Sequence, residues 1–332
     1  QCLVLPGKSG RSYAHLHMPS TKQAQNAIPA DLTERLWAAL LAASRMTRDR
    51  EPEGCTTSFT LDRTGSLQPV AANDPEELLR WRLAEGWVPP ARTLPAAADE
   101  FLRLYLPLCQ ARAGHPVIFG HLGQSLDGYI ATGTGDSCYV TGPENIAHLH
   151  RMRALCDAVI VGAETVAADN PRLTTRLVPG SNPLRVILDP RCRLSSDHRL
   201  FTDGHAPTLV VCGAGHSAPQ ANRFGDARAV QIGTFNGQLA LDELLTVLQE
   251  RGRHSLFIEG GGTTVSRFLQ AGLLDHLQIA VAPLFIGAGR PGIQLPACAR
   301  LKNCLRPRHR IYRMGEDILY DFDLRASRCR GD

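Results

Sequence analysis

Three consecutive glycines give the sequence its sharpest chemical signal. They follow an apolar run at residues 256–258 that ends in Glu259, and they precede Thr263 and Thr264 at the start of a helical pattern. Glycines let a backbone approach a ligand closely, and the N–H groups of a first helical turn attract anions. The pattern predicts a nucleotide-phosphate site, with a tight, ligand-free turn as the alternative. It is neither a G-x-G-x-x-G fingerprint nor a Walker A loop.

Glu259 ends the strand that enters this turn. Open α/β sheets bind ligands at the carboxyl ends of their strands. We therefore expect the Glu259 carboxylate to contact a ligand rather than to serve packing.

Two other polar clusters follow predicted strands. Residues 123–131 contain Asp127 and Gly128, which are also typical of a simple turn. Residues 162–176 start with a short helix that Asn170-Pro171 should end, and they carry Arg172 and Arg176 four positions apart. Such polar density beside a sheet edge suits a phosphorylated, hydroxyl-rich ligand, although a solvated basic loop has the same composition.

Alternating strand and helix patterns from residue 116 onward predict an α/β domain that positions these clusters. The expected helices are 143–155, 241–250 and 263–270. The expected strands are 117–122, 157–162, 184–188, 207–212, 229–232, 255–259, 277–282 and 318–322.

Residues 1–112 have a different pattern and predict a small, mainly helical module of unknown role. Its expected helices run from Asp31 to Arg48, from Asp74 onward and around Phe101 to Tyr105. A hairpin is expected between residues 57–61 and 67–70. Residues 326–332 read as a frayed tail.

Composition excludes several functional classes. The 332 residues are 43% hydrophobic and 20% charged, which predicts a globular protein of two domains. The formal net charge is +4 with scattered basic residues, which argues against nucleic acid as a partner. The sequence has neither a membrane-length apolar run nor a signal peptide, so we expect a cytoplasmic protein. The ten cysteines include no C-x-x-C pair, which predicts reduced thiols and no metal site.

In their order along the chain, these clusters resemble a known family. Together with residues 137–141 and 150–154, they are similar to the reductase domain of the riboflavin-pathway enzyme RibD, over residues 116–323. The resemblance implies a dihydrofolate-reductase-like fold with a central mixed sheet flanked by helices, in a domain we place at 113–325. It also implies a homodimer and NADPH-dependent reduction of a ribosylaminopyrimidine 5′-phosphate, in which ribosyl becomes ribityl.

The resemblance also assigns residues by position. It implies cofactor contacts at Gln124, Tyr139, Thr165 and Asp169, and a pyrophosphate loop from Gly261 to Arg267 that includes Gly262, Thr263 and Thr264. It implies substrate contacts at Ser137, Arg153, Leu173, Arg176 and Glu259.

The chain departs from the family in two ways. It lacks the H-x-E and P-C-x-x-C motifs of the zinc deaminase that precedes this domain in full-length RibD. It also has His121 where the family usually has a lysine that faces the substrate. His121 is then either a ligand contact that titrates near 6.5 or a satisfied structural histidine. With Glu259 and Asp127, it completes our set of catalytic candidates.

The expected function is therefore NADPH-dependent reduction of a phosphorylated pyrimidine. One alternative is a reductase of the same fold that acts on a pterin or folate. The other is a nucleotide-binding protein that has lost catalysis and serves as a sensor or assembly partner.

Overall fold

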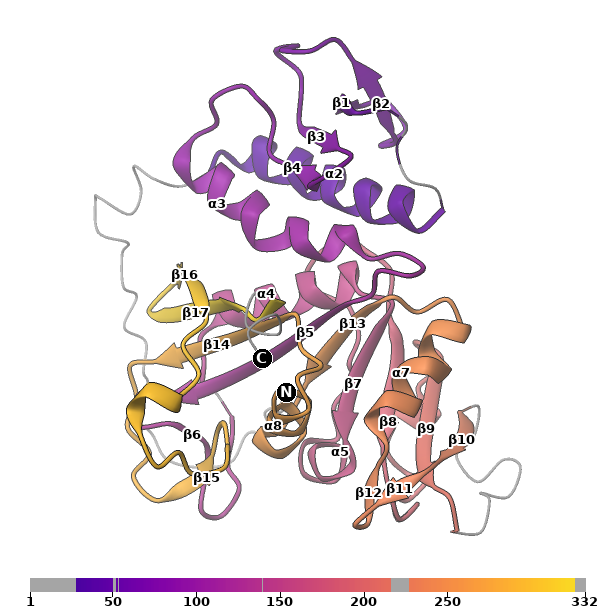
Figure 1. Ribbon diagram of the computed structural model, residues 1–332, viewed down its shortest axis with the longest axis vertical. Coiled ribbons are helices and arrows are strands. Elements are labelled where there is room, and N and C mark those ends of the chain that lie inside the picture. The colour runs from indigo at the N-terminus through magenta and orange to yellow at the C-terminus, as the bar shows by residue number, and fades with distance from the viewer. Residues whose placement is uncertain (1–27, 50–51, 53, 139, 216–226, 326–332) are drawn as a thin grey trace, which may run out of the picture. The chain divides into compact units, whose positions relative to one another are not determined.

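The computed structural model describes residues 28–49, 52, 54–138, 140–215 and 227–325. The chain divides into two compact units, one ending at Gln110 and the other beginning at Ala111 (Figure 1). The second unit carries every site residue predicted above.

The first unit packs helices against a small antiparallel sheet. Its strands are β1 (Thr56–Leu61), β2 (Leu67–Val70), β3 (Leu79–Arg82) and β4 (Gly86–Val88), in the order β2-β1-β3-β4. Its helices are α2 (Ala30–Asp49), α3 (Ala96–Tyr105) and the 3₁₀ turn η1 (Leu106–Gln110). Edge-to-face aromatic pairs fill the core, including Trp81 with Trp87 at 5.4 Å between ring centroids.

The helix expected from Asp74 onward is wrong, because this segment forms a turn and the β3–β4 hairpin instead. Leu79 and Trp81 are buried, whereas their neighbour Arg82 is exposed, which is the period-two pattern of a strand. The Asp74 side chain accepts a bond from the backbone of Glu76 at 2.7 Å. That local turn competes with the start of a helix.

The second unit is built on a nine-stranded mixed sheet in the order β10-β9-β8-β7-β13-β5-β14-β17-β16. All eight predicted strands are present, and they are β5 (Val117–Ser125), β7 (Ala158–Gly162), β8 (Leu184–Leu188), β9 (Thr208–Gly213), β10 (Arg228–Ile232), β13 (Ser255–Glu259), β14 (His276–Ala282) and β17 (Asp317–Asp323). Strands β10 to β14 in this order run parallel, and β17 and β16 are antiparallel to their neighbours. The predicted central mixed sheet flanked by helices is confirmed.

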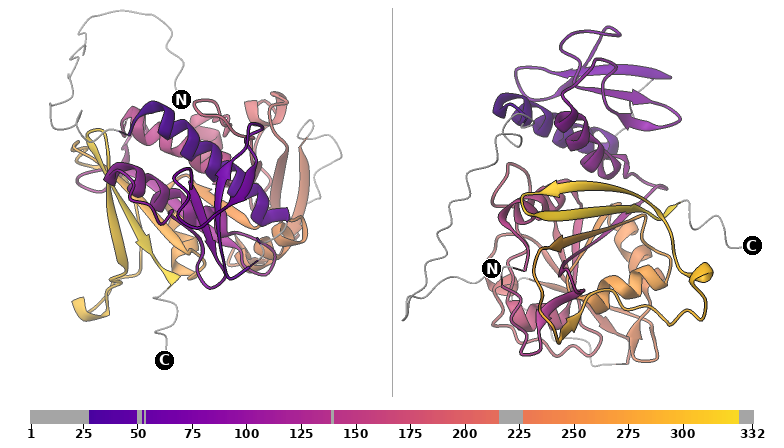
Figure 2. Two further views of the ribbon diagram at one scale, coloured as in Figure 1. Left: turned by 90° about the horizontal axis from the view of Figure 1, so that it is seen from above. Right: turned by 90° about the vertical axis from the view of Figure 1, so that its left-hand side faces the viewer.

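Several shorter elements were not predicted. Strand β16 (Arg308–Met314) forms the edge hairpin with β17, drawn in yellow in Figure 2. Strands β6 (Tyr129–Thr132) and β15 (Gly289–Pro291) pair with each other, as do β11 (Thr234–Phe235) and β12 (Gln238–Leu239). The smallest helical elements are α6 (Arg199–Thr202) and η2 (Leu301–Asn303).

Helices cover both faces of the large sheet, and the two faces differ in polarity. Leucines of α7 (Leu241–Glu250) and Val265 and Phe268 of α8 (Gly262–Gln270) join an apolar core with alternate residues of β5, β7 and β13. Helix α4 (Pro143–Leu155) instead places polar side chains over the opposite face of β5 and β14.

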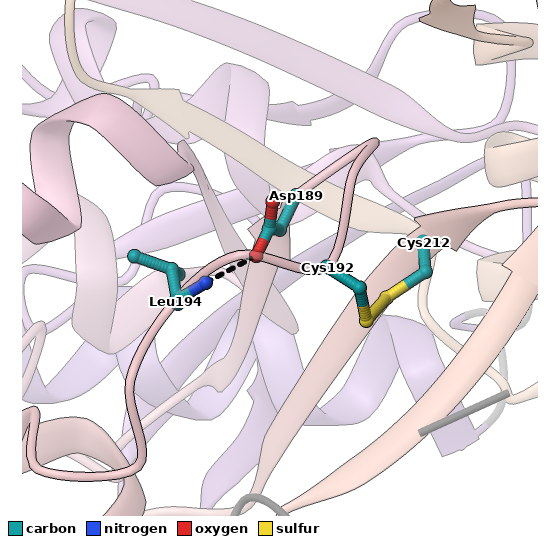
Figure 3. Close-up of a disulfide and its surroundings, with 4 residues drawn as sticks. All are labelled: Asp189, Cys192, Leu194 and Cys212. Carbon is teal, nitrogen blue, oxygen red and sulfur yellow. Dashed lines mark hydrogen bonds between the residues drawn. A yellow bond between two sulfur atoms is a disulfide. The ribbon is translucent and has the colours of Figure 1, made fainter. Parts of the chain in front are cut away.

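The expectation of reduced thiols is wrong at one pair, because Cys192 and Cys212 form a disulfide (Figure 3). They are 20 residues apart in sequence, and their Cα atoms lie 5.6 Å apart. Cys192 follows β8, and Cys212 lies on β9, its parallel neighbour. The sequence gives no sign of this proximity, because strand pairing creates it.

The described residues contain no helix that is long and apolar enough to cross a membrane.

The turn that replaces the expected helix depends on a buried carboxylate, so we predict that Glu77→Gln destabilises the first unit. Glu77 is fully buried, and it accepts bonds from Arg80 at 2.8 Å and from the backbone of Ala91 at 3.1 Å. Removing its charge should lower the free energy of unfolding by about 3 kcal/mol, because the Arg80 guanidinium keeps its charge. Urea unfolding measures this, with the exposed Glu85→Gln as the control. A loss no larger than the control's would contradict the prediction.

Candidate active site

The predicted ligand groups meet at the carboxyl edge of the central parallel strands. In the sheet register Glu259 lies opposite His121, and Gly162 at the end of β7 lies opposite Leu188 of β8. Helix α5 (Ala163–Asp169) follows β7 directly and ends at Asn170 in a left-handed conformation. The edge therefore brings together residues from two of the sequence clusters, the glycine turn and residues 162–176, beside His121.

The glycine turn has the geometry that an anionic ligand requires. Gly260 has φ +152°, and a side chain at Gly262 would lie 2.1 Å from the carbonyl oxygen of Gly292. Helix α8 begins at Gly262 with no side chain bonded to its N-terminus. Its first N–H groups therefore lack intrahelical acceptors. Thr165 Oγ1 accepts a bond from Gly261 N at 3.2 Å, which ties the turn to α5. These donors fit the pyrophosphate of a dinucleotide.

Arg153 and Glu259 form a buried, bidentate ion pair. Arg153 Nε donates to Glu259 Oε2 at 2.7 Å, and Nη2 donates to Oε1. The third arm, Nη1, donates to the carbonyl of Thr174 at 3.1 Å. Because all three arms have acceptors, Arg153 fixes the direction of the Glu259 carboxylate and is not available as a free phosphate grip.

Arg176 keeps free donors. Its Nη1 donates to Thr174 Oγ1 at 2.8 Å, and burial lowers the pKa of its guanidinium. Within the described residues neither Arg176 nor nearby Arg172 makes an ion pair. These two arginines leave uncompensated positive charge beside the ion pair, which favours an anionic ligand.

His150 is a positioning residue to which the sequence analysis gave no role. Its Nδ1 accepts the backbone N–H of Arg176 at 2.8 Å, so its Nε2 carries the proton. It is fully buried, and burial lowers its pKa to about 4. His150 lies one helical turn before Arg153 on α4, and this spacing is the sequence signal that could have indicated its role near the site.

The other predicted contacts occupy three kinds of position. Ser137 Oγ lies 3.4 Å from Asp169 Oδ1, which brings a predicted substrate contact to a predicted cofactor contact. Leu173 is buried and has φ +54°, so its side chain packs inside the protein rather than facing a ligand. Tyr139 lies outside the described residues.

Gln124, Thr263 and Thr264 surround the glycine turn. The Gln124 amide oxygen lies 2.5 Å from the position that a Cβ atom on Gly292 would occupy. Thr264 Oγ1 lies 2.7 Å from the equivalent point at Gly162, and Thr263 is exposed in the first turn of α8.

His121 lies under α4, away from solvent. Its Nε2 lies 3.1 Å from Asn145 Oδ1, and Asn145 Nδ2 donates to Thr141 at 3.0 Å. The Asn145 oxygen must therefore accept, and His121 donates from Nε2. Burial lowers the pKa of His121 to about 4. The geometry favours the structural alternative for His121 over a donor that titrates near 6.5.

Asp127 anchors a loop. Its carboxylate accepts bonds from Ser125 Oγ at 2.5 Å and from the backbone N–H groups of Ile286 and Gly287 at 3.2 and 2.7 Å. These bonds lower its pKa, the Ser125 bond most. Both oxygens are engaged, so the geometry favours a structural role for Asp127.

Among the described residues, no group of three or more His, Cys, Asp or Glu side chains is placed to hold a metal ion.

The fold defines an α/β class built on a nine-stranded mixed sheet, with a glycine turn and two arginines that make no ion pair among the described residues near the carboxyl ends of its parallel strands. A family profile described as RibD C-terminal domain matches residues 116–319, which is more than half of the chain. The chain belongs to the RibD C-terminal domain family.

Curated relatives carry reductase or riboflavin-biosynthesis names. One is a 2,5-diamino-6-ribosylamino-4(3H)-pyrimidinone 5′-phosphate reductase of Methanothermobacter thermautotrophicus, 34% identical over 220 residues, 64% of this chain and 99% of that protein. Another is riboflavin biosynthesis protein RibD of Bacillus amyloliquefaciens, 34% identical over 192 residues. The match spans 57% of this chain and 51% of that RibD, about half of its length.

A solved structure also matches. RibD of Acinetobacter baumannii, form 1, has a TM-score of 0.56 at 25% identity, covering 68% of this chain and 62% of that chain. The riboflavin biosynthesis reductase of Saccharomyces cerevisiae, with a TM-score of 0.53 at 22% identity, shares the fold over 68% of this chain and 97% of its own.

The buried histidines predict a loss of stability in acid. Burial lowers the folded-state pKa of His121 to about 4 and that of His148, which lies 2.8 Å from Gln278 Oε1, to about 3. An unfolded histidine titrates near 6.5, so between these values the unfolded chain binds protons that the folded chain does not. The free energy of unfolding should have its full value above about pH 6.5, and it should decrease as the pH drops below that value. The slope is at most about 1.4 kcal/mol per pH unit for each histidine.

His148→Gln should flatten this fall, because it removes one of the titrating groups. Urea unfolding at pH values from 7 to 4 measures the slope, with the exposed His309→Gln as the control. Parallel profiles for His148→Gln and wild type would show that His148 titrates normally in the folded chain.

The ion pair predicts strong coupling between its partners. Glu259→Gln should lower the free energy of unfolding by about 3–5 kcal/mol, since it leaves the Arg153 guanidinium buried without its carboxylate. Arg153→Met should cost a similar amount, and the Arg153→Met/Glu259→Gln double variant much less than the sum. The exposed pair Arg82–Glu85 is the control, where Glu85→Gln should change stability by about 1 kcal/mol or less. Additive losses in the double variant would refute the coupling.

Proposed function

We propose that the chain reduces the ribosyl group of a ribosylaminopyrimidine 5′-phosphate to ribityl, with NADPH as the reductant. The observation that carries the proposal is the pair of uncompensated arginines, Arg172 and Arg176, at the same sheet edge as the glycine turn. One group suits a substrate phosphate and the other a dinucleotide pyrophosphate. The name of the Methanothermobacter thermautotrophicus relative, a 2,5-diamino-6-ribosylamino-4(3H)-pyrimidinone 5′-phosphate reductase, supports this substrate class.

The chain's own residues bind and orient the substrate. Arg176, held by Thr174 and His150, is directed to grip the 5′-phosphate. Glu259 is fixed by Arg153, and each of its oxygens, which accepts only one bond from Arg153, has a second lone pair for a donor on the pyrimidine or the ribose. When bound, NADPH supplies a hydride. Positioning is then the main catalytic device, because His121 is buried and neutral and both oxygens of Asp127 are engaged.

The other parts of the proposal concern the protein's setting. We place the enzyme in the cytoplasm as a homodimer, with a phosphorylated pyrimidine as its small-molecule substrate. A zinc-free protein and a preference for NADPH over NADH belong to the same proposal.

The test is NADPH oxidation, followed by absorbance, with three substrates in parallel. These are 2,5-diamino-6-ribosylamino-4(3H)-pyrimidinone 5′-phosphate, 5-amino-6-(5-phosphoribosylamino)uracil and dihydrofolate. We expect turnover of at least one pyrimidine and none of dihydrofolate. Turnover of dihydrofolate alone would favour a folate reductase. NADPH binding without turnover of any of them would favour a nucleotide sensor.

We predict that Arg176→Gln raises the KM for the pyrimidine about tenfold and changes kcat little. A phosphate grip that is remote from the reacting carbon stabilises ground and transition states alike. The control is Arg251→Gln, an exposed arginine at the end of α7. A fall in kcat at unchanged KM would contradict a phosphate-binding role for Arg176.

A further inference from the structure

Two cysteine thiols lie together on the loop between β15 and β16. Cys298 is exposed and Cys304 is half-buried, and the 3₁₀ turn η2 lies between them in the chain. The Cys298 thiol donates to the carbonyl of Asn303 at 3.7 Å, and the Cys304 thiol donates to the carbonyl of Arg300 at 3.8 Å. The two bonds cross the turn in opposite directions, so each sulfur lies close to the part of the chain that carries the other cysteine.

The two thiols also contact each other. A hydrogen bond with Cys304 raises the pKa of the Cys298 thiol. Because this bond keeps the proton on Cys298, Cys304 is the cysteine that becomes a thiolate first. A disulfide requires two sulfurs side by side, and these two cysteines meet that condition while both are free. We call them the thiol pair.

Three cations flank the thiol pair along the chain. Arg300, Lys302 and Arg306 are exposed, and none of them makes an ion pair with any described residue. The sequence contains no Asp or Glu from residue 292 to residue 315. Positive charge that is not balanced in this way raises the local concentration of anions. A negatively charged reagent should therefore reach these thiols more often than a neutral one.

We propose that Cys298 and Cys304 form a reversible redox site that reacts with an anionic, low-molecular-weight disulfide such as oxidised glutathione. The Cys304 thiolate attacks one sulfur of that disulfide, which breaks its S–S bond, forms a mixed disulfide and releases one glutathione thiolate. Cys298 then loses its proton to water, and its sulfur attacks the Cys304 sulfur and releases the second glutathione. Two protein thiols are oxidised to one disulfide, and one glutathione disulfide is reduced to two thiols.

The experiment exposes the full chain to oxidised glutathione, blocks the remaining thiols with N-ethylmaleimide and identifies the products by mass spectrometry. Digestion with chymotrypsin, which cuts after Leu301, separates the two cysteines unless a disulfide joins them. We expect a Cys298–Cys304 linkage that an excess of reduced glutathione reverses. It should form about tenfold faster than Cys55, an exposed thiol of the first unit, takes up glutathione. Absence of the linkage, or a rate no higher than that of Cys55, would overturn the proposal.

Single variants test the order of the two steps. Cys298→Ser should leave glutathione trapped on Cys304, because the second thiol is missing. Cys304→Ser should take up glutathione at least about fivefold more slowly, because the remaining thiol holds its proton more tightly. Equal trapping by the two variants would contradict the assignment of Cys304 as the attacking thiolate.

A charge variant tests the selection of an anionic reagent. Arg300→Gln/Lys302→Gln should slow the reaction with oxidised glutathione about threefold or more and leave the reaction with the neutral hydroxyethyl disulfide unchanged. The control is Arg251→Gln, an exposed arginine at the end of α7, which should change neither rate. Equal rates for the charge variant and wild type with oxidised glutathione would show that these cations do not attract the reagent. The whole test is independent of the proposed reductase activity, because neither substrate nor NADPH takes part.

Discussion

The Arg153–Glu259 ion pair is the constraint on which the site depends. It joins helix α4 to the end of the central strand β13, and through the Thr174 carbonyl it reaches the loop that carries Arg176. A buried guanidinium needs its partner, so three segments far apart in sequence are held in one arrangement. His150 adds a second link from α4 to the same loop. The site is therefore a rigid frame around two positive charges, Arg172 and Arg176, that make no ion pair with any described residue.

The polar side chains between α4 and the sheet, among them His121 and His148, have structural rather than catalytic roles. Each histidine donates one hydrogen bond there, His121 to the side-chain oxygen of Asn145 and His148 to that of Gln278. Their low pKa values keep them neutral at physiological pH. A buried neutral histidine can donate a hydrogen bond without adding to the positive charge at the edge.

The sequence was most informative where burial and periodicity act together. Strand Ser255–Glu259 and helix Pro143–Leu155 were predicted to the residue, because apolar runs and an N-terminal proline mark their limits. Strand β16 is not predicted because five of its seven residues are exposed, and only Tyr312 and Met314 alternate as buried residues. The prediction of a helix from Asp74 onward is wrong because the acidic residues of this turn are equally typical of a helix N-terminus. The disulfide, the role of His150 and the burial of His121 depend on contacts between distant segments, which one sequence does not display.

The sheet register has a consequence for how the protein acquires its fold. Strand β13 pairs with β5, whose residues are about 138 positions earlier, and β14 pairs with the other side of the same strand. Strands β8, β9 and β10, by contrast, pair with near neighbours in the chain. During synthesis on the ribosome, β5 therefore has no partner strand until residues 255–259 have emerged, and its second edge stays unpaired until residues 276–282 follow. All strands of the sheet in the unit that ends at Gln110, by contrast, lie within residues 56–88. High contact order of this kind slows folding and exposes strand edges. The early unit thus emerges complete ahead of a slow partner, and the nascent chain is most vulnerable to aggregation in the interval between them.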